Sequence, residues 1–343
     1  MKPTAVGVIG VGRIGTMHTL NLVRHVPEAH VKAVASPHVD PAWADELGIP
    51  IAATDADVLL SDPEIEAVVI ATPSGRHVEM VRRAARAGKQ IFCVKPVAFT
   101  PEAIIEAIDA VAAAGVQLQV GFNRRFDPSI CRLAEAVADG QVGELHSIRV
   151  INRDPKAPPI DFVRRSGGMF FDFTIHDFDV VRFISGSEIE ELYATGAVLV
   201  DPEIGAAGDI DTAIITARLE NGALCVIDNS RQTNYGYDQR FEAFGSKGNL
   251  VVGNTRPTTL VSHVEHGVFA DTPFPSFTER YQDAFIRELQ SFITCVRDGS
   301  PVSVTADDAL AAVNASAAAM NSVQENRPVR LSDAPTTAGR TGP

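Results

Sequence analysis

A glycine-rich segment near the start of the chain constrains the fold more than any other feature. The apolar run Val6–Ile9 has the length and composition of a buried strand, and Gly10-Val-Gly-Arg-Ile-Gly15 follows it directly. In a G-x-G-x-x-G loop between a strand and a helix, Gly10 permits the tight turn and Gly12 lets the backbone approach a pyrophosphate. Gly15 allows close packing of helix and strand, while the helix N-terminus attracts phosphate. We therefore expect a dinucleotide site here.

The rest of the first third alternates short apolar runs with amphipathic segments. Strands are expected at Val31–Ala35, Val68–Ala71, Ile91–Val94 and Leu118–Val120. Helices are expected at 77–87 and at 103–114, the second with Thr100 as N-cap, Pro101 at its first position and Gly115 at its C-terminal exit. Strands that are apolar on both faces and alternate with helices indicate a doubly wound parallel sheet, the Rossmann arrangement.

After about residue 122 the pattern becomes that of an antiparallel sheet. The β-rich segments Thr212–Leu219 and Ala223–Arg231 meet at Asn221-Gly222, and a second hairpin is expected between Gln239–Phe244 and Asn249–Val252. Two helices follow, at about 277–297 and 306–325; the aromatic and apolar side chains of the first recur at helical spacing and predict a buried face. We predict an α+β domain with a large, mostly antiparallel open sheet. The predicted division is 1–122 for the dinucleotide domain, 123–332 for a substrate and oligomerisation domain, and 333–343 for a flexible tail.

Charge and cysteine content exclude several classes of protein. The 343 residues include 30 Lys and Arg against 43 Asp and Glu, a formal net charge of −13, which disfavours nucleic-acid and anionic-membrane partners. The four cysteines form no Cys-x-x-Cys pair and fit reduced thiols. No apolar stretch approaches the roughly 20 residues that span a bilayer, and the N-terminus lacks a signal-peptide pattern. We expect a cytoplasmic protein.

The residue that should distinguish NAD from NADP is unusual. Rossmann domains that bind NAD carry a carboxylate about 20 positions beyond the last glycine, where it binds the ribose hydroxyls. Here Ser36 occupies that strand end, and Arg13 or His38 could pair with a 2′-phosphate. Alternatively, the Ser36 hydroxyl binds the ribose of NAD, or Asp40 bends in to replace the carboxylate. The sequence predicts NAD(P) as the cofactor, with a slight lean to acceptance of NADP.

Several longer motifs together resemble the Gfo/Idh/MocA oxidoreductase family. They are the glycine loop, Ala71-Thr-Pro-Ser-Gly-Arg-His77, Lys95-Pro96 and Gly121-Phe-Asn-Arg-Arg-Phe-Asp127. Within the family, the segments 164–179 and 229–240 look most like those of inositol 2-dehydrogenases. The resemblance extends to about residue 330 and implies NAD(P)-dependent oxidation of a cyclic polyol. It also implies a homo-oligomer, often a tetramer, whose subunits commonly associate through the open sheet.

The resemblance also assigns roles to individual residues. It implies that the catalytic residues are Lys95, Asp172 and His176. The implied cofactor contacts, together with those reasoned above, are Gly10, Gly12, Arg13, Ile14, Gly15, Ser36, His38, Thr72, Pro73, His77, Lys95, Pro96 and Asn123. The implied substrate contacts are Lys95, Arg125, Asn152, Asp154, Asp172, His176 and Tyr235.

The residue types at the catalytic positions suit this chemistry independently. Asp172 and His176 are four apart, so on an α-helix they share one face. Histidine has an ordinary pKa near 6.5 and can take a proton from an alcohol near neutral pH. Lys95 follows a parallel strand, at the sheet edge where such folds bind ligands. In the expected reaction His176 removes the hydroxyl proton while Lys95 polarises the oxygen, and the hydride of the carbinol carbon passes to the nicotinamide, which leaves a ketone. Gly167-Gly168 is expected to let a ligand approach the backbone closely.

One departure from the family and three alternatives stay open. The family usually has Glu-Lys-Pro where this chain has Val94-Lys-Pro, which removes a possible partner of the lysine. Another inositol stereoisomer, or an aldopyranose oxidised at C1, would present a similar ring of hydroxyls. A catalytically inactive nucleotide or sugar sensor is a second alternative. The third is a metal-assisted hydrolase in which Asp172, His176, Asp177 and Asp179 gather as oxygen and nitrogen ligands. The chain offers no second histidine cluster at a convincing spacing, since His263 and His266 are three apart in a predicted loop or strand edge, so no metal site is predicted.

Overall fold

The structure is a computed structural model that describes residues 2–333. The described chain divides into two compact units, one of residues 2–126 with 283–313, and the other of residues 127–282 with 314–333. The sequence-based division into 1–122 and 123–332 therefore omits a return of the chain to the first unit. Of the predicted tail, Leu331–Asp333 form a 3-10 turn, η4, and residues 334–343 lie outside the described residues.

The first unit is built on a six-stranded parallel sheet, which confirms the Rossmann prediction. Its strands, in spatial order, are β3(Ile51–Ala53), β2(Ala29–Ala35), β1(Thr4–Ile9), β4(Ala67–Ile70), β5(Gln90–Val94) and β6(Leu118–Gly121). All five strand pairs are parallel. Because parallel strands end at the same edge, the loops after β1, β4, β5 and β6 all leave the sheet at its carboxyl edge.

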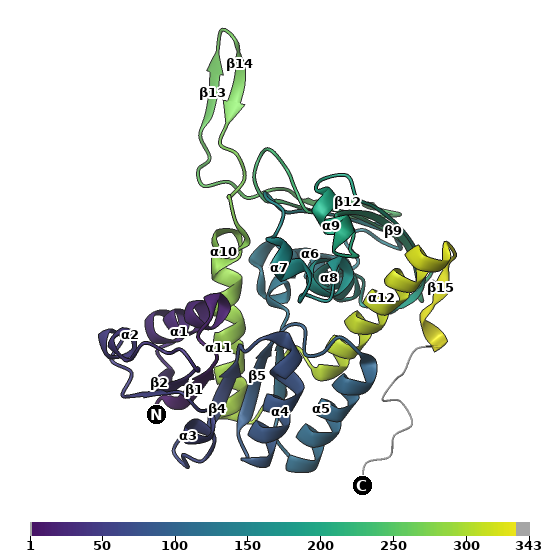
Figure 1. Ribbon diagram of the computed structural model, residues 1–343. Coiled ribbons are helices and arrows are strands. Elements are labelled where there is room, and N and C mark those ends of the chain that lie inside the picture. The colour runs from purple at the N-terminus through teal and green to yellow at the C-terminus, as the bar shows by residue number, and fades with distance from the viewer. Residues whose placement is uncertain (1, 334–343) are drawn as a thin grey trace. The chain divides into compact units, whose positions relative to one another are not determined.

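Helices cover this sheet, and α4 and α5 lie side by side on it (Figure 1). The helices of the unit are α1(Arg13–His25), α2(Pro41–Glu46), α3(Asp57–Leu60), α4(His77–Arg86), α5(Pro101–Ala114) and α11(Gln282–Asp298), with the 3-10 turns η1(Ser74–Arg76) and η2(Asn123–Phe126). The predicted ends of α5 are confirmed: the Thr100 hydroxyl accepts from the amide of Ala103 at 3.4 Å, and Gly115 has φ +64°. Helix α11 belongs here because its apolar face joins the core of β1, β2 and β4.

The second unit contains a seven-stranded, mostly antiparallel sheet, as predicted. Its spatial order is β12(Gly248–Val252), β11(Asp238–Gly245), β7(Leu145–Arg153), β10(Leu224–Ser230), β9(Thr212–Leu219), β8(Ile189–Ala197) and β15(Val329–Arg330). Both predicted hairpins form, and Gly222 at the first turn has φ +87°. The pair β7–β10 is parallel, which brings two strand ends to the same edge.

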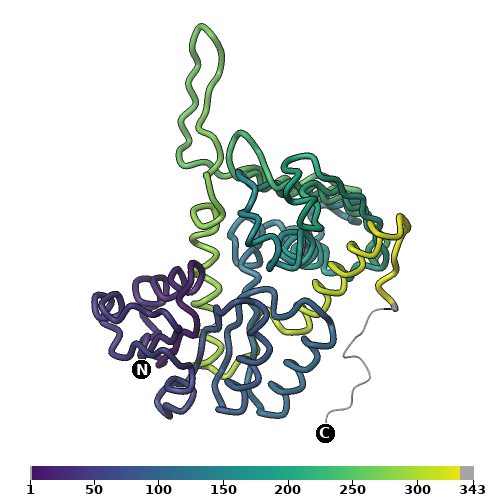
Figure 2. Tube along the Cα trace, viewed as in Figure 1, coloured from purple at the N-terminus to yellow at the C-terminus, as the bar shows by residue number. Residues whose placement is uncertain are grey.

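Helices α6(Pro128–Ala138) and α8(Ile175–Ser185) pack on the strands of this sheet. The unit also holds α7(Ile160–Val163), the π-helix η3(Phe170–Thr174), α9(Pro202–Ala206) and α10(Phe277–Arg280), while α12(Ala306–Glu325) begins in the first unit and ends in the second. The hairpin β13(Val261–Val264)–β14(Gly267–Ala270) extends away from the seven-stranded sheet (Figure 2). No described helix is long and apolar enough to cross a membrane.

Candidate active site

The glycine loop of the first unit has the geometry that pyrophosphate binding requires. Gly10 has φ +93°, and a Cβ there would lie 2.6 Å from the carbonyl oxygen of Ala71. A Cβ on Gly15 would lie 1.8 Å from the carbonyl oxygen of Gly10, so only glycine fits either position. At Gly12, by contrast, a Cβ would meet no atom within 4 Å, and this residue is the N-cap of α1 without a side-chain cap. The open backbone at the start of a 13-residue helix fits a dinucleotide pyrophosphate.

The residues predicted to meet the adenosine ribose lie just after β2. Ser36 is half-buried, and its amide donates to the carbonyl of Ala53 at 3.0 Å. Asp40 is exposed, and its carboxylate caps α2 by accepting from the amide of Ala42 at 3.0 Å. The Asp40 carboxylate is therefore engaged in capping, and Ser36 is the polar side chain that directly follows the strand. Arg13 and His38 are exposed.

A buried histidine links two loops at the carboxyl edge of the first sheet. The Nε2 of His77 lies 2.7 Å from the carbonyl oxygen of Thr72, and its Nδ1 lies 2.7 Å from the carbonyl oxygen of Pro96. Burial lowers the pKa of His77, while the two carbonyl hydrogen bonds act in the opposite direction. His77 thus holds the loop after β4, with Thr72 and Pro73, against the loop after β5, with Lys95 and Pro96.

Three more predicted residues of the first unit lie after β5 and β6. Lys95 directly follows β5 and is half-buried. Asn123 is 4% exposed and starts the turn η2. The guanidinium of Arg125 lies 2.8 Å from the carboxylate of Asp308, so this candidate for substrate binding already has an acidic partner. Val94 ends β5 and packs against the core, so the departure from Glu-Lys-Pro leaves the strand intact.

The predicted acid–base pair of the second unit lies where a π-helix passes into an α-helix. Asp172 is in η3, and its amide donates to the carbonyl of Gly168 at 3.0 Å, while His176 is in the first turn of α8. Gly167 and Gly168 have φ of +83° and +85°. A Cβ on Gly168 would lie 3.0 Å from the carboxylate of Asp209, which also accepts from the amide of Met169. A ligand was predicted to approach the backbone at Gly168, but in the structure the Asp209 side chain occupies that position.

A buried polar network fastens the start of α8 to the sheet. The carboxylate of Asp177, next to His176, accepts from the Nδ2 of Asn152 at 2.8 Å and of Asn229 at 2.9 Å. Asn152 also bonds to Gln239, which accepts in turn from the hydroxyl of Tyr281 at 3.0 Å. Each of these network residues except Tyr281, which is 2% exposed, is fully buried. The network rigidly positions the helix turn that carries His176.

Asp154 and Arg231 follow the two parallel strands of this sheet. The register pairs Arg153 of β7 with Ser230 of β10, so the next residues, Asp154 and Arg231, leave the sheet side by side. The Nη1 of Arg231 lies 3.0 Å from the carboxylate of Asp172 and 3.9 Å from that of Asp154. A buried cation therefore contacts two carboxylates that were predicted site residues. Its own role was not predicted.

Tyr235 belongs to a more exposed cluster. Its hydroxyl donates to Asp238 at 2.7 Å and accepts from Arg153 at 3.2 Å. Burial acts to raise the pKa of Asp238, but hydrogen bonds from Arg240, Tyr235 and Asn254 outweigh it and hold that pKa below its ordinary value. A groove of about 380 Å³ adjoins this cluster, lined by residues of 235–256 and 270–273.

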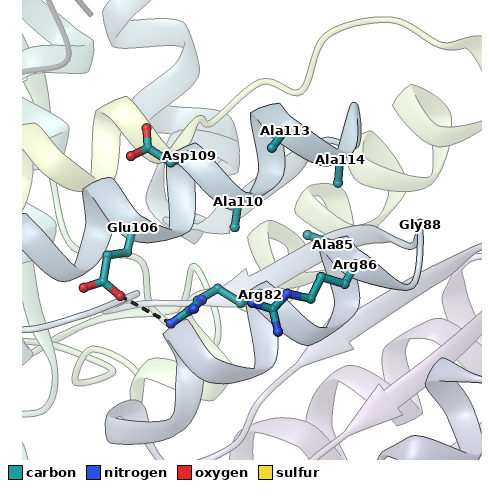
Figure 3. A pocket seen from close by; sticks show the side chains of 9 residues that line it. All are labelled: Arg82, Ala85, Arg86, Gly88, Glu106, Asp109, Ala110, Ala113 and Ala114. Carbon is teal, nitrogen blue, oxygen red and sulfur yellow. Dashed lines mark ion pairs between the residues drawn. The ribbon is translucent and has the colours of Figure 1, made fainter. Parts of the chain in front are cut away.

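A second groove, in the first unit, lies away from these residues. It measures about 850 Å³ and runs between the C-terminal halves of α4 and α5, where Arg82 pairs with Glu106 at 3.5 Å (Figure 3). Its lining consists of four alanines, four charged residues and one glycine, and contains no predicted site residue. Within residues 2–333, no three His, Cys, Asp or Glu side chains gather as metal ligands would.

Comparison with known protein families accounts for both units. Residues 4–122 match the model of the oxidoreductase family with an NAD-binding Rossmann fold, and residues 130–251 match the GFO/IDH/MocA C-terminal domain. The chain belongs to the GFO/IDH/MocA oxidoreductase family. This confirms the family indicated by the glycine loop and the later motifs.

Relatives of this oxidoreductase are similar along nearly its whole length. It is 44% identical to the uncharacterized oxidoreductase YrbE of Bacillus subtilis, covering 96% of this chain and 97% of the relative. It is 43% identical to the myo-inositol 2-dehydrogenase of Thermotoga maritima, covering 96% and 98%. A crystal structure of the scyllo-inositol dehydrogenase of Lactobacillus casei with NAD(H) and scyllo-inositol has 30% identity and a TM-score of 0.90 over 97% of this chain and 100% of that one. The GFO/IDH/MocA chain is thus an NAD-dependent, inositol dehydrogenase-like oxidoreductase that acts on CH–OH groups.

The site residues that sequence reasoning missed are those whose partners are distant in the chain. Arg231, Asn229 and Gln239 lie within the 229–240 motif of this GFO/IDH/MocA chain, from which only Tyr235 was selected. An available signal was the position of Arg231 directly after an apolar strand. Its partner Asp172 is 59 residues away, so no local pattern links the two.

Proposed function

We propose that the chain oxidises myo-inositol at its axial hydroxyl to 2-keto-inositol, with NAD as the cofactor. The observation that carries this proposal is the pair Asp172 and His176. Asp172 lies in η3 and His176 lies in the first turn of α8, which follows directly. The chain that holds them is inositol dehydrogenase-like. The buried Asp177 network beneath them supports a fixed orientation of this turn. Fixed acid–base groups are what alcohol oxidation requires of the protein.

Each catalytic group has a distinct proposed task. His176 takes the proton from the substrate hydroxyl, and Asp172 orients the imidazole and stabilises its protonated form. Lys95, which follows β5, polarises the same hydroxyl oxygen with its ammonium group. NAD, when bound, takes the hydrogen of the carbinol carbon together with its electron pair. The open backbone at Gly12 and the start of α1 fit its pyrophosphate.

Substrate recognition is proposed for polar side chains that are not fully buried. Asp154, after β7, and Tyr235, which is 42% exposed, suit hydrogen bonds to ring hydroxyls. Asn152 is fully buried and bonded to Asp177 and Gln239, so we assign it a supporting role beneath Asp154. Arg125 could serve a substrate only together with its partner Asp308.

A panel of substrates tests the proposal against its alternatives. Initial rates would be measured with myo-, scyllo- and chiro-inositol and with glucose, each with NAD and with NADP. We expect the highest kcat/KM for myo-inositol with NAD. A higher kcat/KM for another inositol, or for glucose, would identify that compound as the substrate instead of myo-inositol. Cofactor binding without turnover of any polyol would favour the inactive sensor.

The variant His176→Ala tests the proposed base. We expect kcat to fall at least about 100-fold, since general bases contribute factors of this size. His30→Ala, at an exposed position of β2, is the control and should keep its activity. Near-normal turnover by the His176 variant, with its fold confirmed by circular dichroism, would remove His176 from the mechanism.

We further propose a cytoplasmic homotetramer. The free state of all four cysteines, three of them buried, supports a reducing compartment. The sheet of the second unit carries exposed apolar side chains on one face, including Leu224, Val226 and Val251. Such a face is typical of an interface between subunits.

A further inference from the structure

We propose that Arg231 is a positioning residue for this dehydrogenation, because it holds Asp172 in a fixed orientation and in its charged form. The inference rests on the proposed role of Asp172 beside His176. Arg231 is not proposed to contact substrate or cofactor. It acts through the carboxylate to which it is bonded.

The contacts of Arg231 converge on the π-helix that carries Asp172. Its side chain is 2% exposed, and Nη1 donates to the Oδ2 of Asp172 at 3.0 Å. The guanidinium carbon also lies 5.0 Å from the ring centroid of Phe173, within the range of a cation–π interaction. Two successive residues of η3 are thus held by one buried side chain.

Arg231 is itself rigidly placed. It follows β10 at the edge where the parallel strand β7 also ends, and its amide donates to the carbonyl of Asp211 at 2.8 Å. The carboxylate of Asp211 accepts from the amides of Leu199, Val200 and Asp201 at 2.8 to 2.9 Å, which fixes this corner of the sheet. A guanidinium on such a support can set the position of a carboxylate.

The charge of Arg231 has a chemical consequence. An arginine side chain stays protonated in proteins, so a buried guanidinium beside Asp172 favours the carboxylate over the carboxylic acid. The proton that His176 takes from the substrate then stays on the imidazole. Other charged or titratable groups lie on the elements that pack here: Asp154 after β7, Asp209 beside Gly168, Asp211 beside the Arg231 amide, and His176, Asp177, Asp179 and Arg182 in α8.

A cost at the same side chain supports a functional role. The Nη2 of Arg231 is buried and has no hydrogen-bond partner among residues 2–333. An unsatisfied buried donor destabilises a fold, and native proteins keep few of them. A methionine would fill much of the same volume without this penalty, so the guanidinium is retained for its charge and its contact with Asp172.

The test compares Arg231→Met, Arg231→Lys, Asp172→Asn and the double variant Arg231→Met/Asp172→Asn. For Arg231→Met we expect kcat to fall about 10- to 100-fold, as for a misplaced catalytic group, with KM within about threefold. The acid limb of the kcat–pH profile should move up by about one unit or more, because Asp172 loses its counter-charge. Arg231→Lys should restore the acid limb but only part of the rate, because lysine lacks the planar fork.

Two controls separate a positioning role from damage to the fold. Arg132→Met makes the same change at an exposed position of α6 in the same unit and should leave both kcat and the profile unchanged. Circular dichroism and the midpoint of thermal unfolding report whether each variant has folded. If Arg231→Met has not folded, Arg231→Lys carries the test, because we expect it to have a reduced rate and an unchanged acid limb.

The double variant decides between the outcomes. If Arg231 acts through Asp172, the double variant should be no slower than Asp172→Asn alone. Independent losses that multiply, or an unchanged kcat and acid limb in Arg231→Met, would overturn the positioning role. Normal turnover by Asp172→Asn would instead overturn the proposed role of Asp172, whatever Arg231→Met does.

Discussion

At the scale of single residues, Ser36 is the position from which the sequence predicts the choice of cofactor. It is half-buried directly after β2, where NAD-binding Rossmann domains usually have a carboxylate. The NAD(H)-bound relative gives no support to a preference for NADP. What the serine predicts is narrower: nothing at this position repels a 2′-phosphate, so NADP should be accepted as a secondary cofactor.

The variant Ser36→Asp tests this prediction. An aspartate would repel the 2′-phosphate, so kcat/KM with NADP should fall at least about tenfold, a difference of roughly 1.4 kcal/mol. The same constant with NAD should stay within about threefold. Ser61→Asp, at an exposed position of α3's C-terminal end, is the matched control. An unchanged ratio of the two constants would show that Ser36 has no part in cofactor selection.

Residues with local signals were predicted well, and residues with distant partners were not. The backbone angle of Gly10 and the clash at Gly15 follow from a motif six residues long. Arg231 required the register of β7 and β10 before its proximity to Asp172 became visible. A linear sequence shows which residues can form a buried ion pair, but strand pairing decides which of them meet.

At the scale of elements, the segment with Asp172 and His176 shows the limit of a periodicity argument. Spacing by four predicted one face of an α-helix, yet Asp172 lies in a π-helix and only His176 lies in α8. The start of this segment is fixed by the positive φ angles of Gly167 and Gly168 and by the hydrogen bond from the Met169 amide to the Asp209 carboxylate. The wide turn therefore depends on a residue 37 positions from Asp172, and π-helical turns are frequent at functional sites.

Helix α11 gave a similar result. The aromatic and apolar spacing correctly predicted burial, as Leu289 and Phe292 are fully buried. Periodicity did not indicate that this face packs on β1, β2 and β4 of the first unit, more than 200 residues earlier in the chain. The same face buries Glu288 beside His18, whose Nε2 lies 4.0 Å from the Oε1 of Glu288.

This buried pair predicts a pH dependence of stability. Burial raises the pKa of Glu288 well above its ordinary value and lowers that of His18 to about 4. In the folded state Glu288 keeps a proton that the unfolded chain releases above about pH 4.5, so stability falls as pH rises beyond that point. The His18 contribution has the opposite sign: stability is lost as pH falls from about 6.5 to about 4, because only the unfolded state takes up the proton.

Glu288→Gln should remove the first contribution and keep the shape of the side chain. Its free energy of unfolding should exceed that of the parent by more than about 1 kcal/mol at pH 7, and the difference should vanish near pH 4. Urea unfolding at both pH values measures it. Glu46→Gln, exposed at the end of α2, is the control and should show no such difference. Equal stability of the Glu288 variant and the parent at pH 7 would contradict the buried, protonated state.

At the scale of the whole molecule, a net charge of −13 would repel other copies of the chain, whereas the proposed tetramer requires copies to associate through the open sheet. One face of the second sheet carries Leu224, Val226 and Ile214, which are 51%, 38% and 39% exposed. Arg149 lies opposite Val226, and Arg218 lies opposite Leu224. The same face also carries Glu242 opposite Arg149 and Glu191 opposite Arg218. It therefore combines apolar area with interspersed charges of both signs, which permits self-association in spite of the net charge of the chain.

The double variant Leu224→Glu/Val226→Glu should dissociate the proposed tetramer. Each new glutamate would have an arginine opposite it within its own subunit, so the fold should survive, but two added charges would have to be buried at a subunit interface. We expect light scattering at micromolar concentration to give a tetrameric mass for the parent and a smaller one for the variant. Val58→Glu, at an exposed position of α3 in the first unit, should stay tetrameric. A variant of unchanged mass would exclude this face as the interface, and a monomeric parent would exclude the tetramer itself.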